Sequence, residues 1–429
     1  MKPLFLLVIV AASPQAAAAQ DVAVAQDTLS DPAEESRRVV PGPQYERGGL
    51  YRRFFGTHYR DLWTAPVTAP VLDLHTFAGG LKPDELGGGQ QTRSLDLKGA
   101  DGRTYVFRSL DKDPTPAVPP MLRETVAHRL IQDATSAGYP GGPLVAARLL
   151  RSAGVLHVTP TLVVMPDDRA LGKYRREFAG MLGYVEEKPD DGFARADEVV
   201  DSDELLDSLN AGPDNQVDAR AFLRARLMDQ LMGDWDRHRD QWKWAAADHG
   251  DRKVWRPIPR DRDQAFVRYD GLFLKLARQA HPKLVVFQPD YPKLLGLTWN
   301  GRDLDRRLLS GLSWADFDSI AGDLVVRISD AAIDSALAGL PQSFQGQWLD
   351  FTRTALIARR DALPAQARAY YQQLATDVDV VASAQADWAE VEREEDGGLT
   401  LRLRSDPGGS VFFERRFLPD ETEEVRLYL

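Results

Sequence analysis

The sequence predicts an α+β protein, because strand and helix patterns occupy separate stretches of the chain. Short segments that alternate apolar and polar residues are concentrated between residues 71 and 187. From about residue 200 to residue 376, apolar residues recur mostly at the spacing of helices. Strand patterns return from residue 387. Separate runs of strands and helices are typical of the α+β class.

The first 20 residues, MKPLFLLVIVAASPQAAAAQ, have the features of a secretory signal peptide. Lys2 supplies a positive start, residues 4–12 form a short apolar run, and residues 17–19 are small, as at a cleavage site. The apolar run is too short to span a bilayer, and no later segment predicts an integral membrane helix. We therefore expect residues 1–20 to be removed and the mature protein to be periplasmic or secreted.

Composition narrows the classes of partner. The 429 residues include 53 Lys and Arg against 64 Asp and Glu, for a net charge of −11. Binding to a phosphate backbone requires a basic surface, so nucleic acid is not the expected partner. The chain has no Cys, which excludes a disulfide framework and a lipid anchor on cysteine.

The first half of the chain predicts an extension followed by a sheet with helices. Residues 21–74 are expected to be a flexible leader and an N-terminal extension, and residues 75–190 a unit of strands and helices. An Asp101-Gly102 turn predicts a hairpin between the second and third strands. The predicted strands are VLDLHTF, SLDLKG, RTYVFRSL, TPTLVVMP and GMLGYVEEKP, and the predicted helices are MLRETVAHRLIQDA and GPLVAARLLRSAG.

The second half predicts a mostly helical unit at residues 191–380 and a small β-region at residues 381–429. The helix VDARAFLRARLMDQLM is apolar on several sides, so we expect it to be buried. It leads directly into LMGDWDRHRDQWKW, in which charged residues and tryptophans are crowded together. The strands QWKWAA and KVWRPI then predict a hairpin, and PRDRDQAF follows it.

Two Asp-rich segments therefore flank one hairpin. Asp236, Asp240 and Gln241 precede it, and Asp261 and Asp263 follow it. Carboxylate and amide oxygens are the ligands that Mg²⁺ prefers, so the two segments together are candidates for a metal site. The alternative is a purely structural salt-bridge cluster, formed by Asp234, Asp236 and Asp240 with Arg237, Arg239 and Arg260.

These two segments resemble motifs of atypical kinases. DWDRHRDQ is similar to the D-R-H loops of lipid kinases, secreted Golgi casein kinases and HipA-type toxin kinases, and RDRDQAF resembles the metal-binding Asp segment of these families and of CotH-type kinases. The order of elements over residues 75–340 is also similar. The resemblance implies a kinase-like two-lobed fold, with an antiparallel sheet and helix in the N-lobe and a mostly helical C-lobe. It also implies phosphoryl transfer from ATP with Mg²⁺ or Mn²⁺.

The resemblance suggests roles for the acidic segments. Asp236 would orient the acceptor hydroxyl. Gln241, five residues later, stands where these families have Asn or an acid, and Asp240 could replace it as a metal ligand. Asp261 or Asp263 would complete the metal site. Both lie on the same face of an extended segment, so the sequence leaves that choice open.

A glycine-rich turn, LGGGQQT, precedes the second predicted strand and resembles a phosphate loop. Gly87, Gly88 and Gly89 would leave backbone N–H groups free to approach a nucleotide phosphate. A loose hairpin would explain three glycines equally well.

The third predicted strand and the following helix would supply the remaining residues of the nucleotide site. Arg108 in YVFRS, or Lys112 shortly after it, would neutralise phosphate charge, although these families usually have Lys in the strand. Asp133 lies on the apolar face of the helix, where the resemblance implies a partner acid for that base.

The sequence thus favours an exported atypical kinase-like phosphotransferase that uses a Mg²⁺- or Mn²⁺-bound nucleotide and an unknown acceptor. ATP is scarce outside the cytoplasm, so a non-catalytic kinase-like module that binds an envelope protein is a second hypothesis. A metal-dependent hydrolase built on the same aspartates is a third.

Overall fold

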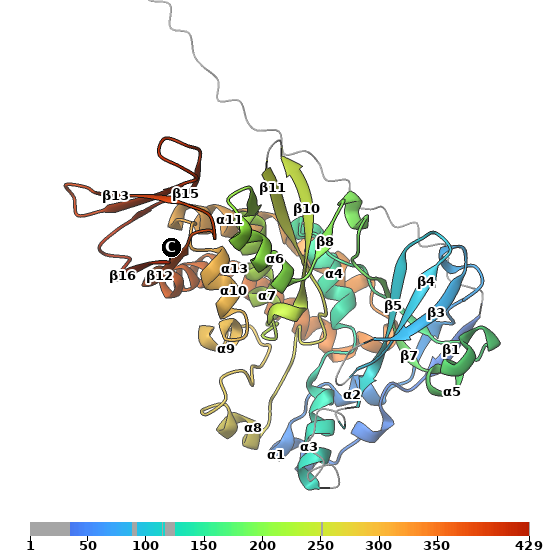
Figure 1. Ribbon diagram of the computed structural model, residues 1–429. Helices are drawn as coiled ribbons and strands as arrows, with labels where there is room; N and C mark the ends of the chain where they lie inside the picture. Colours follow the sequence, from blue (N-terminus) through green and yellow to red (C-terminus); the bar gives the residue numbers. More distant parts are fainter. Residues whose placement is uncertain (1–34, 88–91, 114, 116–124, 250–251, 429) are drawn as a thin grey trace, which may run out of the picture.

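The computed structural model describes residues 35–87, 92–113, 115, 125–249 and 252–428. The predicted signal peptide, and Gly88 and Gly89 of the glycine-rich turn, lie outside these residues. Strands and helices occupy separate regions, which confirms the α+β class (Figure 1). Within the described ranges, no helix has both the length and the apolar character that a membrane crossing requires.

The N-terminal segment, defined here as residues 35–64, packs against much later parts of the chain. Its first strand, β1 (Ser36–Val39), pairs antiparallel with β2 (Val67–Pro70). Two short helices lie between them, α1 (Gly49–Phe55) and α2 (Arg60–Thr64). The Tyr59 ring is fully buried, and its hydroxyl donates a hydrogen bond of 2.7 Å to the Phe266 carbonyl.

A five-stranded antiparallel sheet follows, with the spatial order β3-β4-β5-β7-β6. The predicted Asp101-Gly102 turn joins β4 to β5, and Gly102 has the positive φ of +84° that such a turn requires. The elements of this region are β3 (Leu81–Leu86), β4 (Thr92–Gly99), β5 (Thr104–Lys112), α3 (Val126–Ala134), α4 (Gly142–Ala153), β6 (Thr161–Val164), α5 (Arg175–Phe178) and β7 (Leu182–Glu187).

The prediction of the first strand of this sheet was wrong. VLDLHTF, at residues 71–77, contributes only an isolated bridge at Val71. The Asp73 carboxylate accepts hydrogen bonds from the His75 backbone N–H at 2.8 Å and from the Thr76 hydroxyl at 2.6 Å, so it favours a turn. The edge strand β3 forms later, where a proline and three charged residues conceal the strand pattern.

The next region is mostly helical around a small sheet of order β8-β10-β11-β9. Helix α7 (Ala219–Met232) is buried over most of its length, as predicted from its apolar residues. It ends at Gly233, in the left-handed conformation with φ +71°, and the hairpin β10–β11 follows. The other elements are β8 (Val199–Val200), α6 (Ser202–Ala211), β9 (Asn215–Val217), β10 (Trp242–His249), β11 (Arg252–Pro259), α8 (Leu272–Ala277), α9 (Leu294–Thr298), α10 (Arg302–Leu308), α11 (Trp314–Arg327), α12 (Asp330–Ala338) and α13 (Gly346–Ala375).

The C-terminal β-region forms two small sheets. In one of them, β12 (Asp377–Val381) pairs in parallel with β16 (Glu424–Tyr428). The other joins β13 (Trp388–Arg393), β14 (Leu399–Arg404) and β15 (Val411–Phe417) in antiparallel order. Figure 1 shows this region at the end of the molecule opposite the five-stranded sheet.

Candidate functional site

A cavity of about 230 Å³ lies between the five-stranded sheet and the segment that follows the β10–β11 hairpin. Strand β5 contributes Arg108 and Lys112 to its lining, and strand β7 contributes Glu186. Asp261 and Asp263 line it from the opposite part of the chain. The cavity therefore brings together the predicted strand bases and the predicted metal-binding acids.

Lys112 and Asp263 make the contact that closes this cavity. The Lys112 ammonium forms an ion pair with the Asp263 carboxylate, although 151 residues separate them in sequence. The Lys112 and Asp263 side chains are 18% and 27% exposed, so solvent and small molecules can reach the pair. From α3, the Gln132 amide donates a hydrogen bond of 2.7 Å to the Lys112 carbonyl and holds the end of β5 in place.

Arg108 has a different partner, Glu186 on the neighbouring strand β7. Their side chains approach to 3.4 Å, and both are largely buried. Burial raises the pKa of Glu186, and the positive charges of Arg108 and Arg260 only partly oppose this shift. Glu186 was not among the predicted site residues, and its one local signal is an acid inside an apolar strand.

Asp261 sits in the same cavity on an unusual backbone. Its φ of +47° lies in the left-handed region, which non-glycine residues rarely adopt. Burial alone would raise the pKa of its carboxyl group, but the charges of Arg108 and Lys112 bring it below its usual value. The Arg237 guanidinium donates hydrogen bonds to the Arg260 carbonyl at 2.7 Å and to the Asp261 carbonyl at 3.3 Å, which fixes this backbone.

Asp236 lies close enough for its charge to act on Lys112. Burial lowers the pKa of Lys112, whereas the negative charges of Asp261 and Asp236 oppose that shift. The Asp236 side chain is 29% exposed. The Asn300 amide donates a hydrogen bond of 2.6 Å to Asp236 Oδ1, and the sequence analysis did not identify this contact. Asp236 is therefore oriented, accessible and within the electrostatic reach of the cavity.

The two alternative amide or acid ligands do not line the cavity. The Gln241 side-chain nitrogen lies 3.4 Å from His238 Nε2. The Asp240 carboxylate is 88% exposed and lies 3.5 Å from His238 Nδ1. In the described part of the chain, no group of three or more acidic or histidine side chains is arranged to hold a metal ion.

Asp261 and Asp263 nevertheless suit a magnesium ion that arrives with a nucleotide. Mg²⁺ is commonly bound through one or two protein carboxylates, with water and phosphate oxygens completing its coordination. Both carboxylates line one accessible cavity together with cationic side chains that could contact phosphate. The donor set therefore fits the group that the sequence implied, with fewer protein ligands than we expected.

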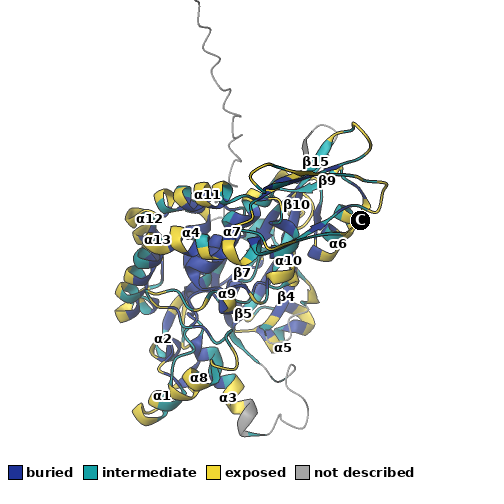
Figure 2. Ribbon diagram, turned by 90° about the vertical axis from the view of Figure 1, so that its left-hand side faces the viewer, coloured by how far each residue is buried: buried dark blue, intermediate teal, exposed yellow. Residues whose placement is uncertain are grey.

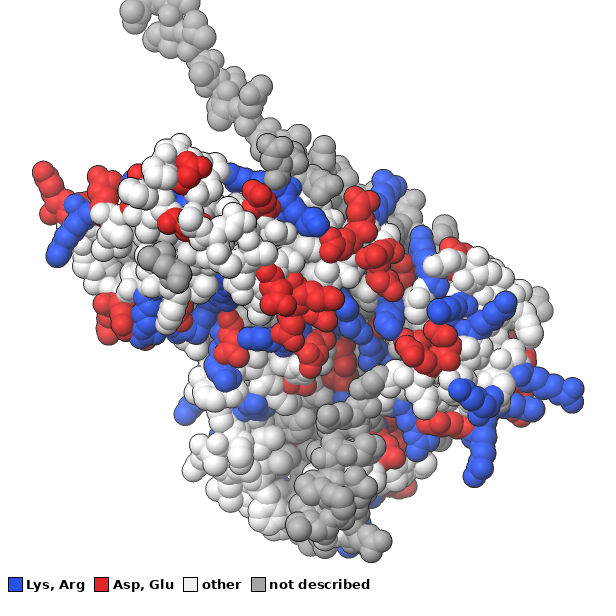
Figure 3. Space-filling model, viewed as in Figure 1, with Lys and Arg blue, Asp and Glu red and all other residues white. Residues whose placement is uncertain are grey.

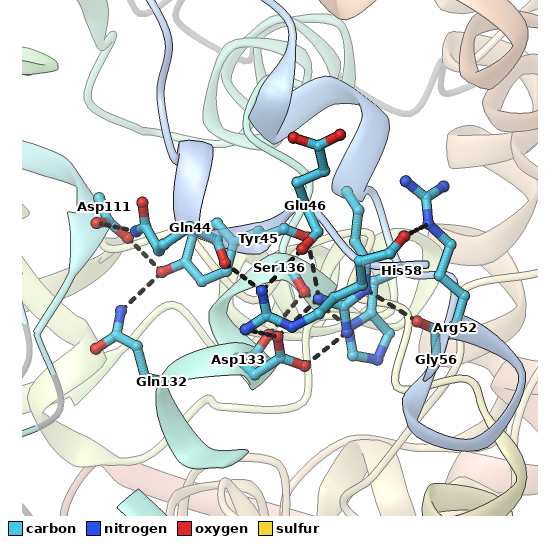
Figure 4. Close-up of polar contacts among 12 residues, drawn as sticks. Gln44, Tyr45, Glu46, Arg52, Gly56, His58, Asp111, Gln132, Asp133 and Ser136 are labelled. Atoms are coloured by element: carbon cyan, nitrogen blue, oxygen red, sulfur yellow. Dashed lines mark hydrogen bonds and ion pairs between the residues drawn. The ribbon is translucent and has the colours of Figure 1, made fainter. Parts of the chain in front are cut away.

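The predicted partner of Asp133 was wrong. We expected it to be the partner acid of Arg108 or Lys112, but it pairs with the N-terminal segment (Figure 4). Both Asp133 oxygens accept hydrogen bonds from the Arg60 guanidinium, at 2.8 and 2.6 Å. Arg47 lies 3.3 Å from the same carboxylate. The inward face of α3 packs against the N-terminal segment here, so the Asp133 carboxylate pairs with Arg60 and Arg47 and not with a base on β5.

Gly87 is the described member of the predicted phosphate loop. It directly follows β3, and its backbone N–H donates to the Ser94 carbonyl at 3.0 Å, so this N–H is not free for a phosphate. A Cβ at this position would collide with the Ser94 side chain, which explains the need for glycine. Gly88 and Gly89 remain predictions.

A buried ion network supports the loop that carries Asp236. Arg262, between the two cavity acids in sequence, also lines the cavity, and its guanidinium contacts the Asp234 carboxylate at 3.0 Å. Asp234 therefore belongs to a structural cluster, as the alternative interpretation proposed, but Asp236 and Asp240 do not. We call the cluster the loop network, and its members are Arg226, Asp229, Asp234, Arg237, Arg262 and Asp305.

Comparisons with known proteins give weak results. No family model and no curated protein matches the chain. Among solved structures, the Helicobacter pylori proinflammatory kinase CtkA is similar over 67% of this chain and 96% of its own, at 14% identity and a TM-score of 0.35. A Golgi casein kinase is similar over 78% of this chain and 84% of its own, at 10% identity and a TM-score of 0.31. We draw no argument about residues or activity from likenesses this low.

Proposed function

We propose that the protein is a kinase-like phosphotransferase that uses a Mg²⁺-bound nucleotide and transfers its phosphoryl group to a hydroxyl acceptor. The observation that carries this proposal is the Lys112–Asp263 ion pair across the cavity. It joins a base on the third strand of the sheet to an acid after the hairpin, and these are the two positions that a kinase-like site requires.

The side chains around this pair suit the chemistry of phosphoryl transfer. Asp261 and Asp263 would hold the metal ion, which supplies positive charge next to the transferred phosphoryl group. Lys112 and Arg108 would contact the phosphates, because both cations face the same cavity. Asp236 would accept a hydrogen bond from the acceptor hydroxyl, since the Asn300 contact at 2.6 Å leaves its other oxygen available.

Nucleotide binding is the first test. ATP with Mg²⁺ or Mn²⁺ should raise the thermal midpoint of the protein, because a ligand that binds the native state stabilises it. The double substitution Asp261→Ala and Asp263→Ala should remove this shift, whereas Asp240→Asn, at a neighbouring exposed acid, should retain it. A parent protein without any shift at millimolar nucleotide would contradict the proposal.

One observation favours a second function, a non-catalytic kinase-like module that binds an envelope protein. Lys112 is paired with Asp263, Arg108 with Glu186, and Arg262 with two acids of the loop network, so the three cations that line the cavity already have acidic partners. If those pairs persist in solution, the cavity has no free cation for phosphate. Phosphate transfer to any hydroxyl acceptor, lost in Asp236→Asn, would exclude this alternative.

A further inference from the structure

Two short helices at one end of the molecule expose large apolar side chains. Neither α1 nor α8 contains a buried residue. Leu50 is 74% exposed, Leu276 57%, Phe273 49% and Leu272 46%. Figures 1 and 2 both show α1 and α8 side by side at this end, and Figure 2 shows much of both in the exposed colour. We call these four side chains the apolar platform. Exposed apolar patches of this kind mark interaction sites.

The platform has a fixed geometry. The Phe273 ring of α8 packs between the helices, 5.6 Å from the Phe54 ring and 5.1 Å from the Phe55 ring. Gly56 and Gly271 have φ of +113° and +102°, and their backbones touch. A Cβ at Gly56 would lie 2.6 Å from the Asp270 carbonyl, so only glycine permits this approach. The exposure of these apolar residues is therefore a property of an ordered structure.

The acids next to the platform, Asp61 and Asp270, are paired with Arg52 and Arg268, and the remaining charges beside it are basic. Residues 271–284 contain three basic residues and no acid, within a chain of net charge −11. Arg53 on α1 and Lys275 on α8 are exposed, and among the described residues neither takes part in an ion pair. Figure 3 shows the surface over α8 as mostly white, while both charge colours are spread over other described parts of that face. An apolar patch bordered by unpaired cations fits a surface that is apolar inside and anionic outside.

We propose that the apolar platform binds the surface of a lipid bilayer that contains anionic headgroups. The leucines and Phe273 would enter the headgroup region, and Arg53 and Lys275 would contact lipid phosphates. A protein partner would have to match each cation with an acid of its own, whereas a bilayer offers anionic phosphates at every position. The inference is independent of the proposed phosphotransfer.

Co-sedimentation with vesicles tests the proposal. The full chain should bind vesicles of equal parts phosphatidylglycerol and phosphatidylcholine, and it should bind phosphatidylcholine vesicles much less. The double variant Leu50→Gln with Leu276→Gln should weaken binding by at least about tenfold, because both side chains leave water on binding. Arg53→Gln with Lys275→Gln should weaken vesicle binding by about thirtyfold, since each cation near an anionic leaflet strengthens binding by about five- to sixfold.

A matched control distinguishes binding through the platform from non-specific adsorption of exposed apolar side chains. Val326→Gln replaces a side chain that is 76% exposed on α11, far from the platform, and should leave binding unchanged. Every variant keeps the apolar residues at the start of the chain, so these contribute equally. Thermal midpoints confirm that the variants fold.

Three results would overturn the proposal: no sedimentation of the parent with phosphatidylglycerol vesicles, equal loss in Val326→Gln, or retained binding in the Leu50 and Leu276 variant. A parent that dimerises in solution, and becomes monomeric in that variant without ever binding vesicles, would show that a second copy of the chain covers the platform.

Discussion

The loop network and the cavity share one short segment, residues 261–263, and their ion pairs differ in exposure to solvent. The loop network contains three Arg and three Asp, all buried, and each charge has a partner of opposite sign. At the cavity, by contrast, the paired Lys112 and Asp263 side chains are 18% and 27% exposed, and Arg108 lies 3.4 Å from Glu186. The fully buried group is suited to holding a structure, and the accessible ion pair is suited to exchanging its partner for a ligand.

Removing one acid from the loop network should have the largest effect on stability. Asp229→Ala leaves the buried Arg226, Arg237 and Arg262 with too few partners, so the free energy of unfolding should fall by roughly 3–5 kcal/mol. Chemical denaturation measures the loss. Asp323→Ala, which removes a partly exposed acid paired with Arg224 and Arg327, should cost only about 0–1 kcal/mol. Equal losses in the two variants would contradict the distinction.

Asp234 and Asp236 are close in sequence, but we expect one to support the structure and the other to act in catalysis. Asp236→Asn should fold with near-normal stability, because the new amide oxygen can still accept the hydrogen bond from Asn300. Phosphotransfer should fall about 10²–10⁴-fold, as expected when a proton-accepting group is lost. Asp234→Asn should instead lower the denaturation midpoint, because Arg262 loses a charged partner. An Asp236→Asn variant as unstable as Asp234→Asn would assign both residues to the structural group.

His58 shows how burial changes a titratable side chain even when an acid lies nearby, since Asp270 is 3.8 Å from its ring. His58 is 1% exposed, and burial lowers the pKa of its imidazole to about 4, with Arg60 adding to the shift. The unfolded chain therefore binds a proton near pH 6.5, before the folded protein does, and stability should fall as the pH drops from about 6.5 to 4. The loss should total about 3 kcal/mol.

His58→Gln tests this pH dependence. The variant has no imidazole to protonate, so its free energy of unfolding should change less than that of the parent between pH 6.5 and 4. Urea denaturation at several pH values compares the two slopes. Identical slopes would mean that His58 is protonated in the folded protein.

The smallest effect is expected at Asp240. Its carboxylate is 88% exposed and lies outside the cavity, so Asp240→Asn should change neither the thermal midpoint nor phosphotransfer measurably. A large loss of activity in this variant, with Mg²⁺ dependence altered, would instead identify Asp240 as a metal ligand.

The sequence predicted those features that short segments determine. Strands β4 and β5, their turn at Gly102 and the buried helix α7 follow from local periodicity and turn chemistry. The β10–β11 hairpin led us to expect that the two Asp segments would meet at one site. Asp261 and Asp263 line the cavity with the β5 bases, whereas the residues of the first segment do not line it.

Partners that depend on distant packing could not be predicted. Arg60 meets Asp133 from 73 residues away, and Asn300 meets Asp236 from 64 residues away. No periodicity links such positions, and each acid had several cations equally near in sequence. The backbone conformation of Asp261 could not be predicted either, because its positive φ is held by hydrogen bonds from Arg237.

The burial of the N-terminal segment has a consequence for the order in which the molecule folds. The backbone N–H of His58 donates to Asp270, 212 residues later, and the Tyr59 hydroxyl donates to Phe266, 207 residues later. Such contacts cannot form on a growing chain until most of it has been synthesised, and pairings of high sequence separation form slowly. During refolding, the amides around Tyr59 should thus gain protection from hydrogen exchange after those of α7. The segment made early would be among the last to reach its place.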